Sequence, residues 1–177
     1  MATPPTFSSG AVLTAAQMNS VGLWLIKTQT IGSAVASVTV TDAFSSDYDN
    51  YLITVSGGAA TTDSNIAFRL GASATAYSGS LIYSTYTIAT VALAQDNNAA
   101  FFNFAGSAGV NGLQFSGRIL GPNLAKHTAI GSDYLGNLSG GNYNGIHKAT
   151  TQHTSFLLAA SAGTWTGGTI KVYGMRN

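Results

Sequence analysis

Short stretches in which apolar and polar residues alternate run through most of the sequence, and this alternation points to β-structure. From Ala36 to Thr41, alanine or valine alternates with serine or threonine. A similar period of two recurs in Asn50–Ser56 and Asn65–Leu70. This period places every second side chain on the same face of a strand. It is typical of antiparallel strands that cover a core on one side.

Nine such segments, separated by Gly, Asn and Ser and with no helical period between them, predict an all-β fold. Their spacing favours an antiparallel β-sandwich of jelly-roll type over alternating strands and helices. The Gly-rich segment Gly136–Gly145 is predicted to be an exposed loop at one end of the sandwich. The predicted strands are Ala34–Thr41, Asn50–Ser56, Asn65–Leu70, Leu81–Ala94, Ala99–Phe104, Leu113–Leu120, Lys126–Leu135, Thr154–Ala160 and Gly168–Tyr173.

Residues 1–28 differ from the rest and are predicted to be an N-terminal arm with one short helix, preceding a β-sandwich domain at 29–177. Thr14 and Gln17 have the spacing of a capping box, in which each side chain bonds the backbone N–H of the other. Leu13 and Met18 are placed to form the hydrophobic staple that accompanies such a cap. We therefore expect a helix of about two turns beginning near residue 15.

A helix of two turns is unstable alone in water, so this one must pack against another surface. Phe7, Val21, Trp24 and Leu25, together with Met18, supply apolar side chains for that contact. One interpretation is that the arm folds back and completes its own core. The preferred interpretation is that it docks on a neighbouring subunit or on a larger particle.

Charged side chains make up only 7% of the chain, against roughly 25% in an ordinary soluble protein. Hydrophobic residues reach 45%, and the formal net charge is +1. Little repulsion therefore opposes self-association, and we expect a homo-oligomer. The alternative is a monomer kept soluble by its hydroxyl and amide groups. Seven scattered basic residues cannot form the positive stripe that nucleic-acid binding needs, so no nucleic-acid partner is predicted.

Three uncharged windows are long enough to span a bilayer, but all are rich in Ser, Thr, Gly and Asn, so no membrane insertion is predicted. The windows are Leu70–Gln95, Asn97–Gly117 and Ala149–Ile170. The first ten residues lack a basic segment and contain Pro4 and Pro5, which argues against a secretory signal peptide.

No sequence motif predicts catalysis or a cofactor. The chain has no cysteine, no phosphate-binding loop and no G-x-S-x-G motif, and Ser139 before two glycines is the nearest approach to a nucleophile. The six Asp residues are explained by solvated turns. In a threefold assembly, one of His127, His147 and His153 could meet its copies on the axis and hold an ion. The more common outcome is an ordinary surface or strand histidine.

Tyr143 is flanked by Asn142 and Asn144 within the predicted Gly-rich loop. An exposed aromatic ring between two amides is typical of surfaces that bind sugars, by stacking and hydrogen bonding. The three residues are therefore candidates for a receptor-facing loop. The alternative is a tyrosine packed on its own hairpin.

Three segments carry a resemblance to a known group of proteins. Phe7–Asn19 (FSSGAVLTAAQMN) resembles the N-terminal signature of small virion proteins of tailed bacteriophages, of the tail-fibre or minor structural type. Ser46–Tyr51 (SDYDNY) is similar to that family's start of its β-domain, and Gly167–Gly174 (GGTIKVYG) to its closing strand. The resemblance implies a trimeric β-sandwich displayed on the exterior of a phage particle after synthesis in the host cytoplasm. It implies no catalytic residue.

The sequence thus favours a non-enzymatic structural protein of a tailed-phage virion. We expect a homotrimer that is anchored through its arm to other virion proteins and contacts the host surface. A capsid decoration protein that stabilises the head is the alternative. A carbohydrate-binding adhesin with depolymerase activity, acting on a host glycan, is the third hypothesis.

Overall fold

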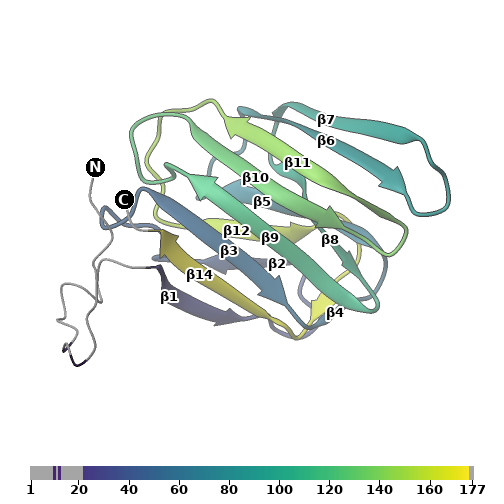
Figure 1. Ribbon diagram of the computed structural model, residues 1–177, viewed down its shortest axis with the longest axis horizontal. Helices are drawn as coiled ribbons and strands as arrows, with labels where there is room; N and C mark the ends of the chain where they lie inside the picture. Colours follow the sequence, from purple (N-terminus) through teal and green to yellow (C-terminus); the bar gives the residue numbers. More distant parts are fainter. Residues whose placement is uncertain (1–9, 11, 13–21, 176–177) are drawn as a thin grey trace.

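Every regular element in the described part of the chain is a β-strand. The computed structural model describes residues 10, 12 and 22–175, and all paired strands within them are antiparallel (Figure 1). The predicted all-β antiparallel class is confirmed. The strands are β1 (Leu23–Thr30), β2 (Ser37–Val40), β3 (Asn50–Ser56), β4 (Ala59–Ala60), β5 (Ser64–Leu70), β6 (Tyr77–Thr85), β7 (Val91–Ala99), β8 (Phe102–Gly109), β9 (Gly112–Leu120), β10 (Thr128–Leu135), β11 (Ser139–His147), β12 (Phe156–Ala160), β13 (Trp165–Thr166) and β14 (Thr169–Met175).

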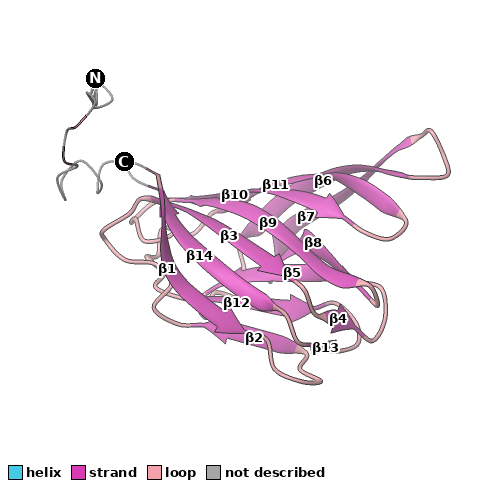
Figure 2. Ribbon diagram, turned by 60° about the horizontal axis from the view of Figure 1, so that its bottom comes forward, coloured by secondary structure: helices cyan, strands magenta, loops and turns pink. Residues whose placement is uncertain are grey.

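The strands lie in two layers (Figure 2). One layer has the order β1-β14-β3-β9-β10-β11-β6-β7, and the other has the order β2-β12-β5-β8. The tight β8–β9 hairpin joins them, with Gly109 paired to Gly112. The short strands β4 and β13 pair with each other at one end. The order ends at β7, which leaves that long strand at the edge of the first layer.

An aromatic cluster fills the space between the layers. The Phe68 ring stacks on Phe156 at 5.1 Å and on Phe115 at 6.1 Å, and it lies 6.4 Å from Phe102. These four side chains come from strands of both layers and are almost completely buried. Burying each aromatic ring contributes about 2–3 kcal/mol. Strand β9 shows the expected alternation of side-chain exposure. From Leu113 onward, its buried and exposed residues alternate without interruption.

Two predictions about the chain between residues 77 and 147 are wrong. The predicted strand Leu81–Ala94 is the β6–β7 hairpin, whose turn at 86–90 contains none of the Gly, Pro, Asn or Asp that usually mark turns. The predicted loop Gly136–Gly145 mostly forms β11, paired with β10 and β6. Its glycines serve close packing: a Cβ on Gly141 would lie 2.7 Å from the Cα of Tyr83.

β1 was not predicted, and it contains two of the candidate anchor residues, Trp24 and Leu25. It pairs with β14 over its whole length, with one irregularity between Leu25 and Lys27. The boundary predicted between residues 28 and 29 therefore falls inside a strand, and the sheet begins at Leu23. The helix predicted near residue 15 lies outside the described residues, as do the candidate anchor residues Phe7, Leu13, Thr14, Gln17, Met18 and Val21.

Candidate functional site

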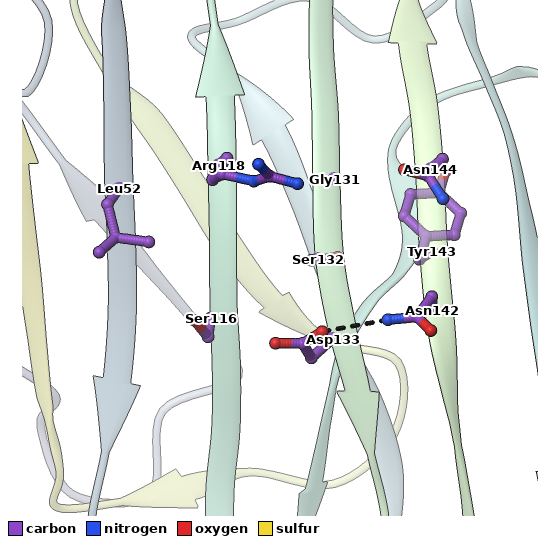
Figure 3. A pocket seen from close by; sticks show the side chains of 9 residues that line it. All are labelled: Leu52, Ser116, Arg118, Gly131, Ser132, Asp133, Asn142, Tyr143 and Asn144. Carbon is purple, nitrogen blue, oxygen red and sulfur yellow. Dashed lines mark hydrogen bonds between the residues drawn. The ribbon is translucent and has the colours of Figure 1, made fainter. Parts of the chain in front are cut away.

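A shallow polar depression lies on the outer face of the first layer, where β3, β9, β10 and β11 run side by side (Figure 3). Strand register places its residues in two adjacent rows. In the first, Arg118 on β9 is paired with Leu52 on one side and Gly131 on the other, and Gly131 is paired with Asn144. In the second, Asp133 is paired with Ser116 and Asn142. The depression has a volume of about 450 Å³.

Gly131 is the low point of the first row. A Cβ at this position would lie 3.3 Å from Asn144 Oδ1 and 3.9 Å from an Arg118 Nη atom. The Arg118 and Asn144 side chains therefore approach the glycine from opposite sides, and Figure 3 shows the Arg118 guanidinium extending from β9 toward β10 at this level. The Arg118 side chain is exposed, and its guanidinium has no hydrogen bond or ion pair with any other residue that the structure describes.

The second row carries a negative group that is already engaged. Asn142 Nδ2 donates a hydrogen bond of 3.1 Å to Asp133 Oδ1. Lys171 on β14 extends this row, because it is paired with Thr54, which is paired with Ser116. The depression itself is thus lined by one cation, Arg118, and one carboxylate, Asp133, with Lys171 one strand beyond β3.

Tyr143 does not face this depression with its ring, and its prediction as an exposed loop residue is wrong. It lies in β11 between two exposed asparagines and is completely buried. Its hydroxyl donates a 2.6 Å hydrogen bond to Asp96 Oδ2 on β7. Burial and this hydrogen bond both raise the pKa of the Tyr143 hydroxyl. Asn142 and Asn144 are exposed, as predicted, but from a strand.

Asp96 accepts two further hydrogen bonds. The backbone N–H of Asn103 donates to Oδ2 at 2.9 Å, and its side-chain amide donates to Oδ1 at 2.6 Å. The carboxylate is 7% exposed and thereby ties edge strand β7 to β8 and β11. This buried network is structural, and it fixes the strand behind Asn142 and Asn144.

The second notable surface is apolar and lies on the β6–β7 hairpin, whose tip projects beyond the neighbouring loops in Figures 1 and 2. Ile82 and Leu93 are direct cross-strand partners, and Leu93 and Val91 are each 73% exposed. Tyr86 at the turn donates its backbone N–H to Leu138 O. We call this surface the hairpin patch; it comprises Ile82, Tyr86, Ile88, Val91, Leu93 and Leu138.

Two of the three histidines are buried inside the chain, so neither His147 nor His153 is placed to meet its copies on a symmetry axis. The His147 and His153 rings lie 5.4 Å apart, and His147 packs against Tyr77 at 4.4 Å. His147 Nε2 lies 2.8 Å from the Ser73 hydroxyl. His127 is exposed.

Acid should destabilise the fold through this histidine pair. Burial lowers the pKa of both His147 and His153, and each is further lowered by a neighbouring histidine, His127 and His147 respectively. The unfolded chain, with histidine pKa values near 6.5, then binds more protons than the folded one. Stability is therefore lost as the pH falls below about 6.5.

The expected result is a thermal midpoint that falls between pH 7 and pH 5, followed by circular dichroism. His153→Gln should make that fall shallower, because one buried titrating ring is gone. His127→Gln, at an exposed position, removes only the smaller cause that lowers the pKa of His147 and leaves both buried rings in place, so it should change the slope less than His153→Gln does. Equal slopes for wild type and His153→Gln would count against this account.

Comparisons with known proteins give no match to a protein family, to a curated protein or to a solved structure. Within residues 22–175, with residues 10 and 12, no helix has the length and apolarity required to cross a bilayer. Among the same residues, no group of three or more His, Cys, Asp or Glu side chains is placed to hold a metal ion. The function is therefore inferred from the chain's own surfaces.

Proposed function

We propose that the protein is a structural, non-enzymatic subunit of a tailed-phage virion. In this proposal it forms a homotrimeric, jelly-roll-like β-sandwich on the exterior of the particle. The single observation that carries the proposal is the hairpin patch, where large apolar side chains are exposed to solvent on the hairpin that forms the edge of the first layer. Exposed apolar patches of this kind mark surfaces that other proteins cover.

The edge strand itself supports the choice of a second copy as the covering partner. The sequence of β7 is VALAQDNNA, which has no Lys, Arg or Pro, and its single charged residue, Asp96, points inward. Natural proteins usually protect an edge strand with charge, proline or a covering segment. With 7% charged residues overall, identical copies repel each other weakly. Self-association through the hairpin would cover both the apolar side chains and the free strand edge.

The N-terminal residues are proposed to attach the oligomer to other virion proteins. The two-layer body begins at Leu23, so the attachment segment is redefined as residues 1–21. Removing these residues leaves every described strand intact.

Deleting residues 1–21 should therefore give a protein that folds but is not incorporated into particles. Circular dichroism and thermal melting of the truncated protein should show the β-sheet signal and cooperative transition of the full chain. Phage lacking the gene, complemented with either version, should carry the full chain and lack the truncated one when purified particles are analysed. Incorporation of the truncated protein at the full-chain level would contradict the attachment role.

A further inference from the structure

We propose that the depression on the outer face binds a carboxylated sugar, with Arg118 as the group that receives the carboxylate. The proposal goes beyond an architectural role and does not depend on it, because every residue involved belongs to one chain. It starts from the unengaged guanidinium of Arg118, which extends toward Gly131.

The first step is the charge of the ligand. Arginine presents planar, parallel N–H donors that match the two oxygens of a carboxylate. The nearest carboxylate in the second row, Asp133, does not approach Arg118 closely enough for an ion pair and is bonded to Asn142 instead. Lys171 lies outside the depression, one strand beyond β3, so the Arg118 guanidinium is the cation that lines it. An anionic group on the ligand therefore supplies the partner that the Arg118 guanidinium lacks within the chain.

The second step is the rest of the ligand. Asn144 and Asn142 each offer an amide donor and a carbonyl acceptor, and the Asp133 carboxylate and the Ser116 hydroxyl accept from hydroxyl groups. The two rows are two residues apart along each strand, which is about 6.6–6.8 Å. Arg118 and Asn144 thus lie on one row, and Ser116, Asp133 and Asn142 lie on the other, so the carboxylate-binding group and the hydroxyl-recognising groups are spaced at the scale of one sugar ring. A uronic acid residue carries both kinds of group.

The third step is the shape of the floor. Gly131 lacks a side chain, so a ring can approach the sheet between Arg118 and Asn144. The ordered backbone beneath is held by the buried Tyr143–Asp96 hydrogen bond on the opposite face of β11. The depression is therefore presented on a sheet rather than on a loop, which reduces the cost of ordering it on binding.

The test uses the purified full chain labelled with ¹⁵N, and two probes with the same sugar rings: tetragalacturonate, whose carboxylates are charged, and its methyl ester, whose carboxyl groups are neutral. We expect the acid to shift amide signals of β9, β10 and β11 and the ester to bind at least about tenfold more weakly. Arg118→Gln should lower the affinity for the acid by about the same factor and bring it near that of the ester. Rising salt should weaken binding of the acid.

Lys126→Gln is the matched control, because it removes one exposed positive charge from the turn before β10, at a residue that does not line the depression. It should bind the acid like the wild type. Gly131→Val should weaken both probes, since the added side chain occupies the floor. The proposal is overturned if acid and ester bind equally, if Arg118→Gln binds like the wild type, or if neither probe shifts these strands at millimolar concentration. None of these outcomes depends on the oligomeric state.

Discussion

Asp96→Ala should destabilise the fold by about 3–5 kcal/mol and lower the thermal midpoint by about 10 °C. The substitution removes the acceptor of three hydrogen bonds, from the Tyr143 hydroxyl and from the backbone and side chain of Asn103. The Tyr143 hydroxyl is then buried without a partner, and each such group costs about 1–3 kcal/mol. Edge strand β7 also loses its tie to β8 and β11, and its amides should exchange with deuterium faster.

Two variants separate this network from general effects of removing a carboxylate. Tyr143→Phe loses one hydrogen bond and leaves Asp96 with both donors of Asn103, so its cost should be smaller, about 1.5–3 kcal/mol. Asp133→Ala removes an exposed carboxylate and should change stability by no more than about 0.5 kcal/mol. Denaturant unfolding measures all three. A cost for Asp96→Ala no greater than that for Asp133→Ala would show that the network contributes nothing.

The strands that the sequence predicted well are those with a clean period of two. Asn50–Ser56 was predicted with both its ends, and Leu113–Leu120 differs from β9 by one residue. Alternation sufficed in these cases because one face packs on the aromatic core and the other meets solvent. Alternation cannot find a turn made of ordinary residues, so the hairpin at 86–90 was missed.

The Gly-rich strand β11 shows a second limit. Glycine was interpreted as a loop signal, but Gly141 and Gly145 lie in a strand. Glycine is required at these two positions because neighbouring groups leave no room for a Cβ. A usable signal was present: exposed Asn142 and Asn144 alternate with buried Tyr143. Glycine in a strand often marks such close approach.

The depression could be predicted only in part. Asn142 and Asn144 were identified from their amides, whereas Arg118 and Asp133 were not. Both lie on outward-facing positions of predicted strands, but their meeting depends on the register between β9, β10 and β11. Register is set by turn geometry and by packing of the opposite face, which a single sequence does not specify.

Leu93→Lys should convert the oligomer to monomers with little effect on the fold. The side chain is 73% exposed in the single chain, so a lysine there can reach solvent. In the proposed assembly the same position is covered, and burying an unpaired ammonium group is strongly unfavourable. We expect a loss of at least about 2 kcal/mol of association free energy, roughly thirtyfold in Kd.

Thr39→Lys is the matched control, because it adds the same charge to an exposed strand position on β2, in the other layer. It should leave the mass of the assembly unchanged. If the two variants behave alike in sedimentation, the hairpin patch is not the contact surface. Equal thermal midpoints for both variants and the wild type would confirm that neither change acts through unfolding.

The mass of the purified wild-type protein in solution tests the central claim most directly. The claim is that copies of the chain cover the hairpin patch and much of a surface that carries few charges. Sedimentation velocity over a wide concentration range should give a species of three times the 18.1 kDa chain mass, with Leu93→Lys shifted to the single-chain mass. A wild-type protein that stays at the single-chain mass at the highest concentration contradicts the account.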